Sequence, residues 1–224
     1  MDITSARELS QKLQISVDYI AREEYEILIL KEVFESEFGV GFVFKGGTAL
    51  RLAYNSPRFS QDIDFTQIQE FDKEKFMTFL RGLANKYPAI KSIETNEKFY
   101  TIFGLAKIKE DYLKRAFSIK IEISKRERKW VKGKDYTDKL IRSETTPLTA
   151  IAQVASLEQI LAEKKDAMKN RKVARDLFDY WYIHLLLKQE IKVDFQGYDK
   201  KRAKSELHRL LPRNFWRVIE TWLI

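Results

Sequence analysis

The chain has 224 residues, a formal net charge of +8 at pH 7 and no cysteine. This length suits one large domain or two small ones, and the lack of cysteine excludes disulfides and thiolate metal sites. No apolar run approaches the ~20 residues of a membrane-spanning helix and no signal-peptide layout is present, so we expect a cytoplasmic protein without a membrane partner.

The charge is distributed unevenly along the chain. Residues 1–112 carry 15 Lys and Arg against 18 Asp and Glu, whereas residues 113–224 carry 26 against 15. A strongly basic half favours a polyanionic partner such as a nucleic acid, although a basic surface that serves only solubility is the alternative.

The first two thirds of the chain alternate between helix and strand patterns. Apolar residues at three- and four-residue spacing predict helices within residues 5–38, and Gly39 and Gly41 then introduce a strand at residues 42–44. Period-two patterns predict further strands, and an amphipathic pattern predicts a helix between them. These segments are a strand at 62–65, a helix at 72–87, and strands at 99–108 and 117–124.

The last third has a helical pattern. Pro147 marks a boundary, and residues 148–187 and 214–223 then predict helices. We therefore expect a catalytic domain over residues 1–145 and a helical subdomain over residues 146–224.

The segment between the first two predicted strands has the features of a phosphate and metal site. Gly46 and Gly47 permit a tight turn, and Thr48 is placed to cap the following helix, whose free amides and dipole favour an anion. Asp62 and Asp64 lie two residues apart on a strand, so they share a face and repel each other unless a cation lies between them. The alternative is an ordinary turn followed by solvated aspartates.

Two separated motifs together resemble one known family. The run Lys45-Gly-Gly-Thr-Ala-Leu-Arg-Leu, with Arg58-Phe-Ser-Gln-Asp-Ile-Asp-Phe, resembles the signature of the nucleotidyltransferase superfamily and, more narrowly, of the AbiEii/AbiGii toxins of type IV toxin–antitoxin pairs. The downstream run Ala162-Glu-Lys-Lys-Asp-Ala-Met-Lys-Asn-Arg-Lys-Val-Ala-Arg-Asp-Leu-Phe-Asp179 is similar to that family's second motif. The resemblance covers roughly residues 40–180.

The resemblance implies an α/β fold of the polymerase beta-like type, with a mixed sheet, flanking helices and a C-terminal helical subdomain. It also implies transfer of a nucleoside monophosphate from an NTP to RNA, with tRNA as the favoured acceptor, and a cognate antitoxin as partner. A small-molecule nucleotidyltransferase and a nucleotide-binding module without turnover are the alternatives.

The resemblance assigns site residues in both motifs. The catalytic residues that it implies are Asp62, Asp64, Glu122, Lys164 and Asp176, of which the first three would bind Mg²⁺ or Mn²⁺. The nucleotide-binding residues that it implies are Gly46, Gly47, Thr48, Arg58, Ser60, Lys165, Arg171 and Arg175, with Asp179 in support. Glu163 before Lys164 favours Lys164 over Lys165 as the functional lysine, but both stay open.

Several of these residues have a plainer interpretation. Glu122 is a lone acid on the polar face of an apolar strand, and pairing with Lys120 or Lys125 is its alternative. Arg58 and Ser60 either contact phosphate or support the loop. Residues 164–179 also fit the solvated face of one long helix.

A basic segment at residues 125–139 surrounds Trp130 and Tyr136, as expected of an RNA-binding surface or of a charged hairpin at a sheet edge. His184 and His208 are isolated and fit no metal-ligand spacing, which predicts structural roles.

Overall fold

The computed structural model describes residues 1–126 and 129–223. Seven strands in these residues form one mixed sheet in the order β3-β4-β5-β2-β1-β7-β6. The strands are β1 (Phe42–Lys45), β2 (Asp62–Gln67), β3 (Ile90–Lys98), β4 (Thr101–Ile108), β5 (Phe117–Ser124), β6 (Tyr136–Ser143) and β7 (Thr146–Ala155). β2 runs parallel to β5 and β1 parallel to β7, and the other neighbours are antiparallel.

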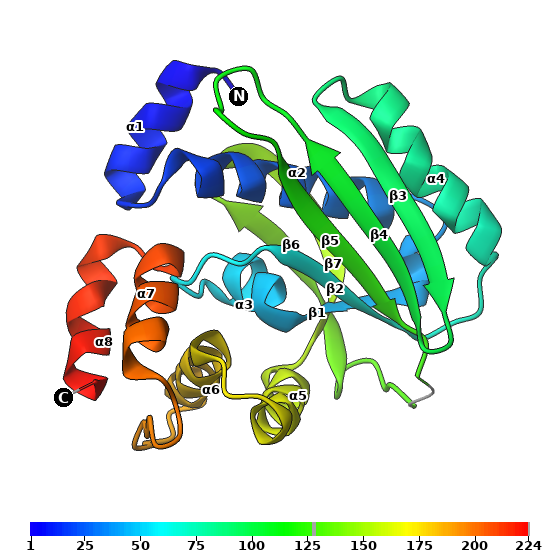
Figure 1. Ribbon diagram of the computed structural model, residues 1–224. Helices are drawn as coiled ribbons and strands as arrows, with labels where there is room; N and C mark the ends of the chain where they lie inside the picture. Colours follow the sequence, from blue (N-terminus) through cyan, green and yellow to red (C-terminus); the bar gives the residue numbers. More distant parts are fainter. Residues whose placement is uncertain (127–128, 224) are drawn as a thin grey trace.

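The helices surround this sheet and extend beyond it at the C-terminal end (Figure 1). They are α1 (Ile3–Leu13), α2 (Val17–Phe34), α3 (Gly46–Tyr54), α4 (Lys73–Lys86), α5 (Leu157–Asn170), α6 (Ala174–Leu186), α7 (Lys200–Leu210) and α8 (Trp216–Trp222), with short 3₁₀ turns at Gly39–Gly41 and Arg213–Phe215. Asp2, Asp72, Ser156 and Asp199 cap the starts of α1, α4, α5 and α7 with side-chain hydrogen bonds to backbone amides.

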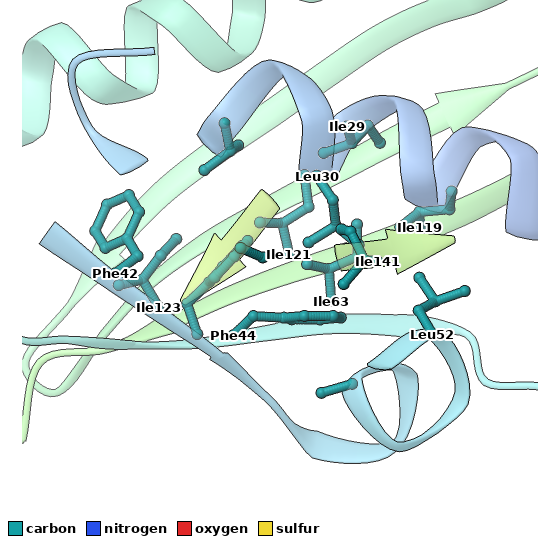
Figure 2. Packing of buried hydrophobic residues seen from close by; sticks show 14 of the residues in the cluster. Ile29, Leu30, Phe42, Phe44, Leu52, Ile63, Ile119, Ile121, Ile123 and Ile141 are labelled. Atoms are coloured by element: carbon teal, nitrogen blue, oxygen red, sulfur yellow. The ribbon is translucent and has the colours of Figure 1, made fainter. Parts of the chain in front are cut away.

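The main core lies between the sheet and the helices α2 and α4. Figure 2 shows Ile29 and Leu30 of α2 above Ile63 of β2 and Ile121 of β5. All four side chains are fully buried, and each contributes about 1.5–3 kcal/mol relative to exposure. Because strand side chains alternate, the polar residues beside Ile63 and Ile121 are turned to the opposite face of the sheet.

Most elements in the first part of the chain agree with the sequence predictions. The predicted strand at 117–124 is β5, and the helix predicted at 72–87 is α4. The helical prediction for residues 5–38 is confirmed as α1 and α2, and the strand prediction for 99–108 is confirmed as β4.

The prediction of helix from residue 148 is wrong, because residues 146–155 form β7. Ala150, Ala152 and Val154 alternate with more exposed neighbours, which is the period of a strand with one buried face. Pro147 lies near the start of β7, where a missing backbone donor is tolerated. The helical part therefore begins at Leu157, whereas the division into two domains stays a prediction.

The prediction of one long helix through residues 164–179 is also wrong. The chain leaves α5 at Arg171, which has extended dihedrals (φ −150°, ψ 146°), and α6 starts three residues later. This break places α6 beside α5 (Figure 1). Side chains that would share one helix face instead face each other across two helices.

Two smaller buried clusters contain residues from the helices near the two ends of the chain. The helices α6, α7 and α8 share an aromatic cluster that includes Phe178 and Trp222. The loop before β2 packs Phe59 against α7, and the Phe59 amide donates to the Leu210 carbonyl at 2.8 Å. Within residues 1–126 and 129–223, no helix combines the length and apolar character that crossing a bilayer requires.

Candidate functional site

The acidic residues of the first motif lie on the sheet face that α2 and α4 leave free. Strand register places Lys45 of β1 opposite Asp64 of β2, and Asp64 opposite Glu122 of β5. Asp62 lies one pleat away on the same face, opposite Lys120. The sequence prediction that alternation would bring the acids to one face is thus confirmed.

The charges on this face repel one another. Burial and the carboxylate of Asp62, with a smaller contribution from Glu122, raise the pKa of Asp64 to about 6, although Lys45 and Lys120 oppose the shift. A cation between Asp62 and Asp64 would relieve this repulsion, and carboxylate oxygens are the ligands that Mg²⁺ and Mn²⁺ prefer. The two aspartates therefore fit a divalent metal.

Glu122 forms an ion pair with Lys120, which is the alternative to a metal-binding role given above. The Lys120 Nζ atom lies 3.0 Å from Oε2 of Glu122 and 3.7 Å from Oδ2 of Asp62. Among the residues that the structure describes, no three acidic or imidazole side chains are grouped closely enough to hold a metal ion. Glu122 as a third metal ligand stays a prediction.

The two glycines of the first motif bring the start of α3 against these groups. Gly46 has φ +79°, and a Cβ atom there would lie 2.5 Å from Oδ2 of Asp64. At Gly47 a Cβ atom would lie 2.2 Å from Nη2 of Arg58 and 3.0 Å from Oγ of Ser60. Only glycine leaves both the backbone geometry and the space for these contacts, so the turn holds Asp64 and Arg58 close to the free amides of α3.

Thr48 does not cap α3. The helix begins at Gly46 with Lys45 in the cap position, and Thr48 is fully buried in its first turn. The Thr48 hydroxyl donates a hydrogen bond to the backbone carbonyl of Asp62. This bond fixes β2 to α3, and a nucleotide-binding role for Thr48 stays a prediction.

The second motif forms a buried network of charges with the first. Arg58 makes a two-point contact with Asp179, through Nε at 2.6 Å and Nη2 at 2.8 Å. Lys164 Nζ lies 2.7 Å from Asp179 and 2.9 Å from Asp176, and Arg171 Nε lies 2.8 Å from the other oxygen of Asp176. Three cations thus alternate with two carboxylates across α5, α6 and the loop before β2.

Both carboxylates of the network are fully buried and ionised. Burial alone would raise the pKa of Asp179, but the charges of Arg58 and Lys164 outweigh it and hold that pKa below its usual value. Lys164 and Arg171 lower the pKa of Asp176 in the same way. Breaking such a pair is costly, so the network fixes α6 against the sheet.

The cations of the second motif divide into buried and exposed groups. Arg58 is 2 % exposed and Lys164 is similarly enclosed, which agrees with loop support as the role of Arg58. Arg171 is 51 % exposed, Lys165 is exposed beside the ring of Tyr180, and Arg175 pairs with Glu206 at 3.4 Å. Among the predicted nucleotide-binding cations, Arg171 and Lys165 are therefore exposed, whereas Arg175 is only partly exposed.

Sequence reasoning gave Lys45 no role in the site and named Lys120 only as a possible partner of Glu122. Lys45 extends from β1 to Glu163 of α5 at 2.6 Å, and Lys120 lies between the acids of β2 and β5. Their positions on the polar face follow from strand alternation. The contact of Lys45 with α5 and that of Lys120 with Asp62 depend on how distant segments pack, which no local pattern gives.

The aromatic residues of the basic segment do not form the expected surface. Tyr136 is buried in β6, and Trp130 packs against the main core. Glu127 and Arg128 of this segment lie outside the described residues. His184 contacts Gln189, and His208 stacks on Trp216, as expected for structural histidines.

Known structures share this arrangement of strands and helices. The chain is similar to JHP933 from Helicobacter pylori, with a TM-score of 0.57 and 23% identity over 86% of this chain and 75% of that one. A nucleotidyltransferase of H. pylori described as putative matches with a TM-score of 0.54 and 20% identity, over 93% and 97% of the two chains. MenT4, a nucleotidyltransferase toxin of Mycobacterium tuberculosis, matches with a TM-score of 0.54 and 18% identity over 84% of this chain and 62% of that one.

These likenesses show the fold, and they confirm the predicted α/β class. A search of curated protein sequences found no match. The profile of a family described as "Nucleotidyl transferase AbiEii toxin, Type IV TA system" matches residues 28–218, a span that contains both motifs and the charge network between them. The chain therefore belongs to this family of nucleotidyltransferase toxins.

Proposed function

We propose that this nucleotidyltransferase moves a nucleoside monophosphate from an NTP to RNA, with tRNA as the first candidate acceptor, and that the reaction needs Mg²⁺ or Mn²⁺. The observation that carries the proposal is the contact between the Gly46 turn and Asp64. It brings free backbone amides, which suit phosphate, beside paired carboxylates, which suit the accompanying metal.

The reaction is an in-line displacement at the α-phosphorus. The oxygen of an acceptor hydroxyl forms a bond to the α-phosphorus, the bond from that phosphorus to the oxygen bridging the α- and β-phosphates breaks, and pyrophosphate leaves. In this proposal Glu122 accepts the hydroxyl proton. A divalent ion held by Asp62 and Asp64 would offset the negative charge of the reacting phosphates.

The remaining site residues bind or position the triphosphate. The amides of Gly46 and Gly47 and the cations Lys165, Arg171 and Arg175 would hold its oxygens. Lys164 and Asp176 would act through Arg171, because Asp176 fixes the Arg171 guanidinium from a buried position. Ser60, packed against Gly47, supports the turn.

Membership in a type IV toxin family also supports a partner. We infer a cognate antitoxin that counters the effect of this chain in the cell. The basic second half of the sequence supports RNA as the acceptor over a small molecule.

The test supplies each α-³²P-labelled NTP with total tRNA and Mg²⁺. We expect labelled RNA with at least one NTP, and a loss of about 100-fold or more for Asp64→Asn because the metal loses a ligand. Asp138→Asn is the matched control, since Asp138 is a half-exposed strand carboxylate on β6, which two other strands separate from β2.

Each outcome has a defined meaning. Label that appears only in a small acceptor would replace RNA with the small-molecule alternative. Nucleotide that binds and never reacts, with any acceptor, would leave a binding module. Full activity of Asp64→Asn would overturn the metal assignment.

A further inference from the structure

Two aromatic side chains are exposed at the tip of the β3–β4 hairpin. Phe99 is 83 % exposed and Tyr100 is 55 % exposed, and their rings meet edge to face with centroids 4.5 Å apart. They form a two-residue turn between the paired residues Lys98 and Thr101. Such turns favour Gly, Asn and Asp, so neither the turn nor the core accounts for two aromatic rings at this place.

Basic side chains surround this tip. A hollow of about 560 Å³ is lined by Phe99 together with cations from α4 and from the segment after β5, and among the described residues that line it Glu70 is the only acid. These cations are Lys73, Lys125, Arg126 and Lys129. Glu97 pairs with Lys73 and Lys125, which leaves the exposed Arg126 and Lys129 as the cations that face solvent here.

The Arg126 guanidinium lies over the Tyr100 ring, 5.5 Å from its centroid. Proteins that bind single-stranded nucleic acids often place an aromatic ring, on which an unpaired base stacks, beside a guanidinium that contacts a phosphate. Paired bases in a duplex offer no free face to such rings.

The tip is connected to the proposed catalytic face. On β4, Phe103 lies opposite Glu122 and Thr101 opposite Ser124, so Tyr100 is about three residues, or ~10 Å, beyond Glu122. A second hollow of about 450 Å³, between the sheet and α5, is lined by Lys45, Thr66 and Ser124 and shares Arg126 with the first. The two hollows therefore adjoin at Arg126, one beside Phe99 and the other beside strand residues near Asp64.

We propose that this aromatic–basic surface, Phe99, Tyr100, Arg126 and Lys129, binds the single-stranded 3′ end of the RNA acceptor. Bases stack on the two rings, Arg126 and Lys129 contact phosphates, and the terminal hydroxyl lies toward Glu122. The direction of the strand rests on the proposed function, whereas the binding of single-stranded RNA by this surface does not.

The test measures RNA affinity directly, without NTP. A fluorescein-labelled single-stranded 12-nucleotide RNA, and the same RNA annealed to its complement, are titrated with the wild type and with a Phe99→Leu/Tyr100→Leu variant, and anisotropy is recorded. Leucine keeps an apolar surface but removes the stacking planes, so we expect the variant to bind the single strand about 5- to 100-fold more weakly. The control Ile151→Ala removes an exposed apolar side chain from β7, far across the sheet, and leaves affinity unchanged.

A second variant tests the charges independently. Arg126→Gln should lower the slope of log affinity against log salt by about 0.7, the contribution of one phosphate contact on a single strand. An unchanged slope, unchanged affinity of the leucine variant, or equally tight binding of the annealed duplex would each overturn the proposal.

Labelling assays on the same variants separate this proposal from the proposed function. Weaker single-strand binding in the leucine variant, without nucleotide transfer by the wild type, would support the surface and contradict the transferase reaction on RNA. Transfer to RNA that is unaffected in the leucine variant, with unchanged affinity, would support the reaction and overturn the surface.

Discussion

Replacement of Asp179 by alanine tests how strongly the charge network holds the molecule together. Asp179 accepts two hydrogen bonds from Arg58, at 2.6 and 2.8 Å, and pairs with Lys164 at 2.7 Å. Without it, Arg58 keeps only its bond to the Phe59 carbonyl and remains buried with an unpaired charge. Removing one partner of a buried pair costs about 3–5 kcal/mol, so we expect the free energy of unfolding to fall by that amount.

Equilibrium urea denaturation at pH 7 measures this loss. The control Asp138→Ala breaks an exposed pair with Lys132 and should change the free energy of unfolding by less than ~1 kcal/mol. An Arg58→Met/Asp179→Leu variant removes both charges and should recover part of the loss. If Asp179→Ala costs no more than Asp138→Ala, the network does not stabilise the fold and the reasoning fails.

The same carboxyl makes stability depend on acid pH. The pKa of Asp179 is lower in the folded protein than in the unfolded chain, because the cations Arg58 and Lys164 outweigh its burial. The stabilisation that ionised Asp179 contributes is therefore fully present above about pH 4. It is lost as the pH falls through the pKa of Asp179 in the folded protein. The Asp179→Asn variant should lack this part of the acid-induced loss of stability. Parallel curves of unfolding free energy against pH for the variant and the wild type below pH 4 would contradict this prediction.

Three further predictions concern single residues. Gly46→Ala should reduce nucleotide transfer at least tenfold, because the added Cβ atom would displace Asp64 and because a φ of +79° costs about 1–2 kcal/mol for alanine. Activity within twofold of the wild type in the labelling assay would refute this prediction. In urea denaturation, Glu26→Gln should stabilise the protein more at pH 8 than at pH 5. Burial raises the pKa of Glu26 well above its usual value, so Glu26 ionises in the unfolded chain but not in the folded protein as the pH rises. An equal effect at both pH values would refute the raised pKa. Lys165→Met should raise the KM for NTP and leave the free energy of unfolding unchanged, because Lys165 is exposed. Lys164→Met should lower the free energy of unfolding by about 3–5 kcal/mol, because Lys164 pairs with a buried carboxylate. The reverse pattern would mean that the two lysines have exchanged roles.

The sequence was sufficient for the parts of the site that depend on local geometry. Strand alternation placed Asp62 and Asp64 on one face and Ile63 in the core, because a period of two has a single solution once one face is apolar. Glycine spacing located the turn at Gly46, since a tight approach of backbone to a side chain leaves few other residues possible.

The parts that depend on distant contacts could not be read in this way. Lys164 and Asp179 have the spacing of a solvated helix face, and nothing near them in sequence shows that both are buried. Both are buried because the helix ends at Arg171 and α6 then packs beside α5. Arg171 itself pairs with Asp176 on the other side of this break. The strand β7 was mistaken for helix because its small apolar residues, such as Ala150 and Ala152, suit either structure, and its pairing with β1 and β6 decided the outcome.

The pairing of Arg58 with Asp179 has a consequence for the synthesis of the protein. The two residues are 121 positions apart, and the aspartates of β2 leave the ribosome long before α6 does. A copy that stops before α6 keeps the acids and the glycine turn, but its Arg58 has no carboxylate partner. In a toxin family this order of synthesis means that incomplete translation products lack both carboxylates of the charge network on which the proposed activity depends.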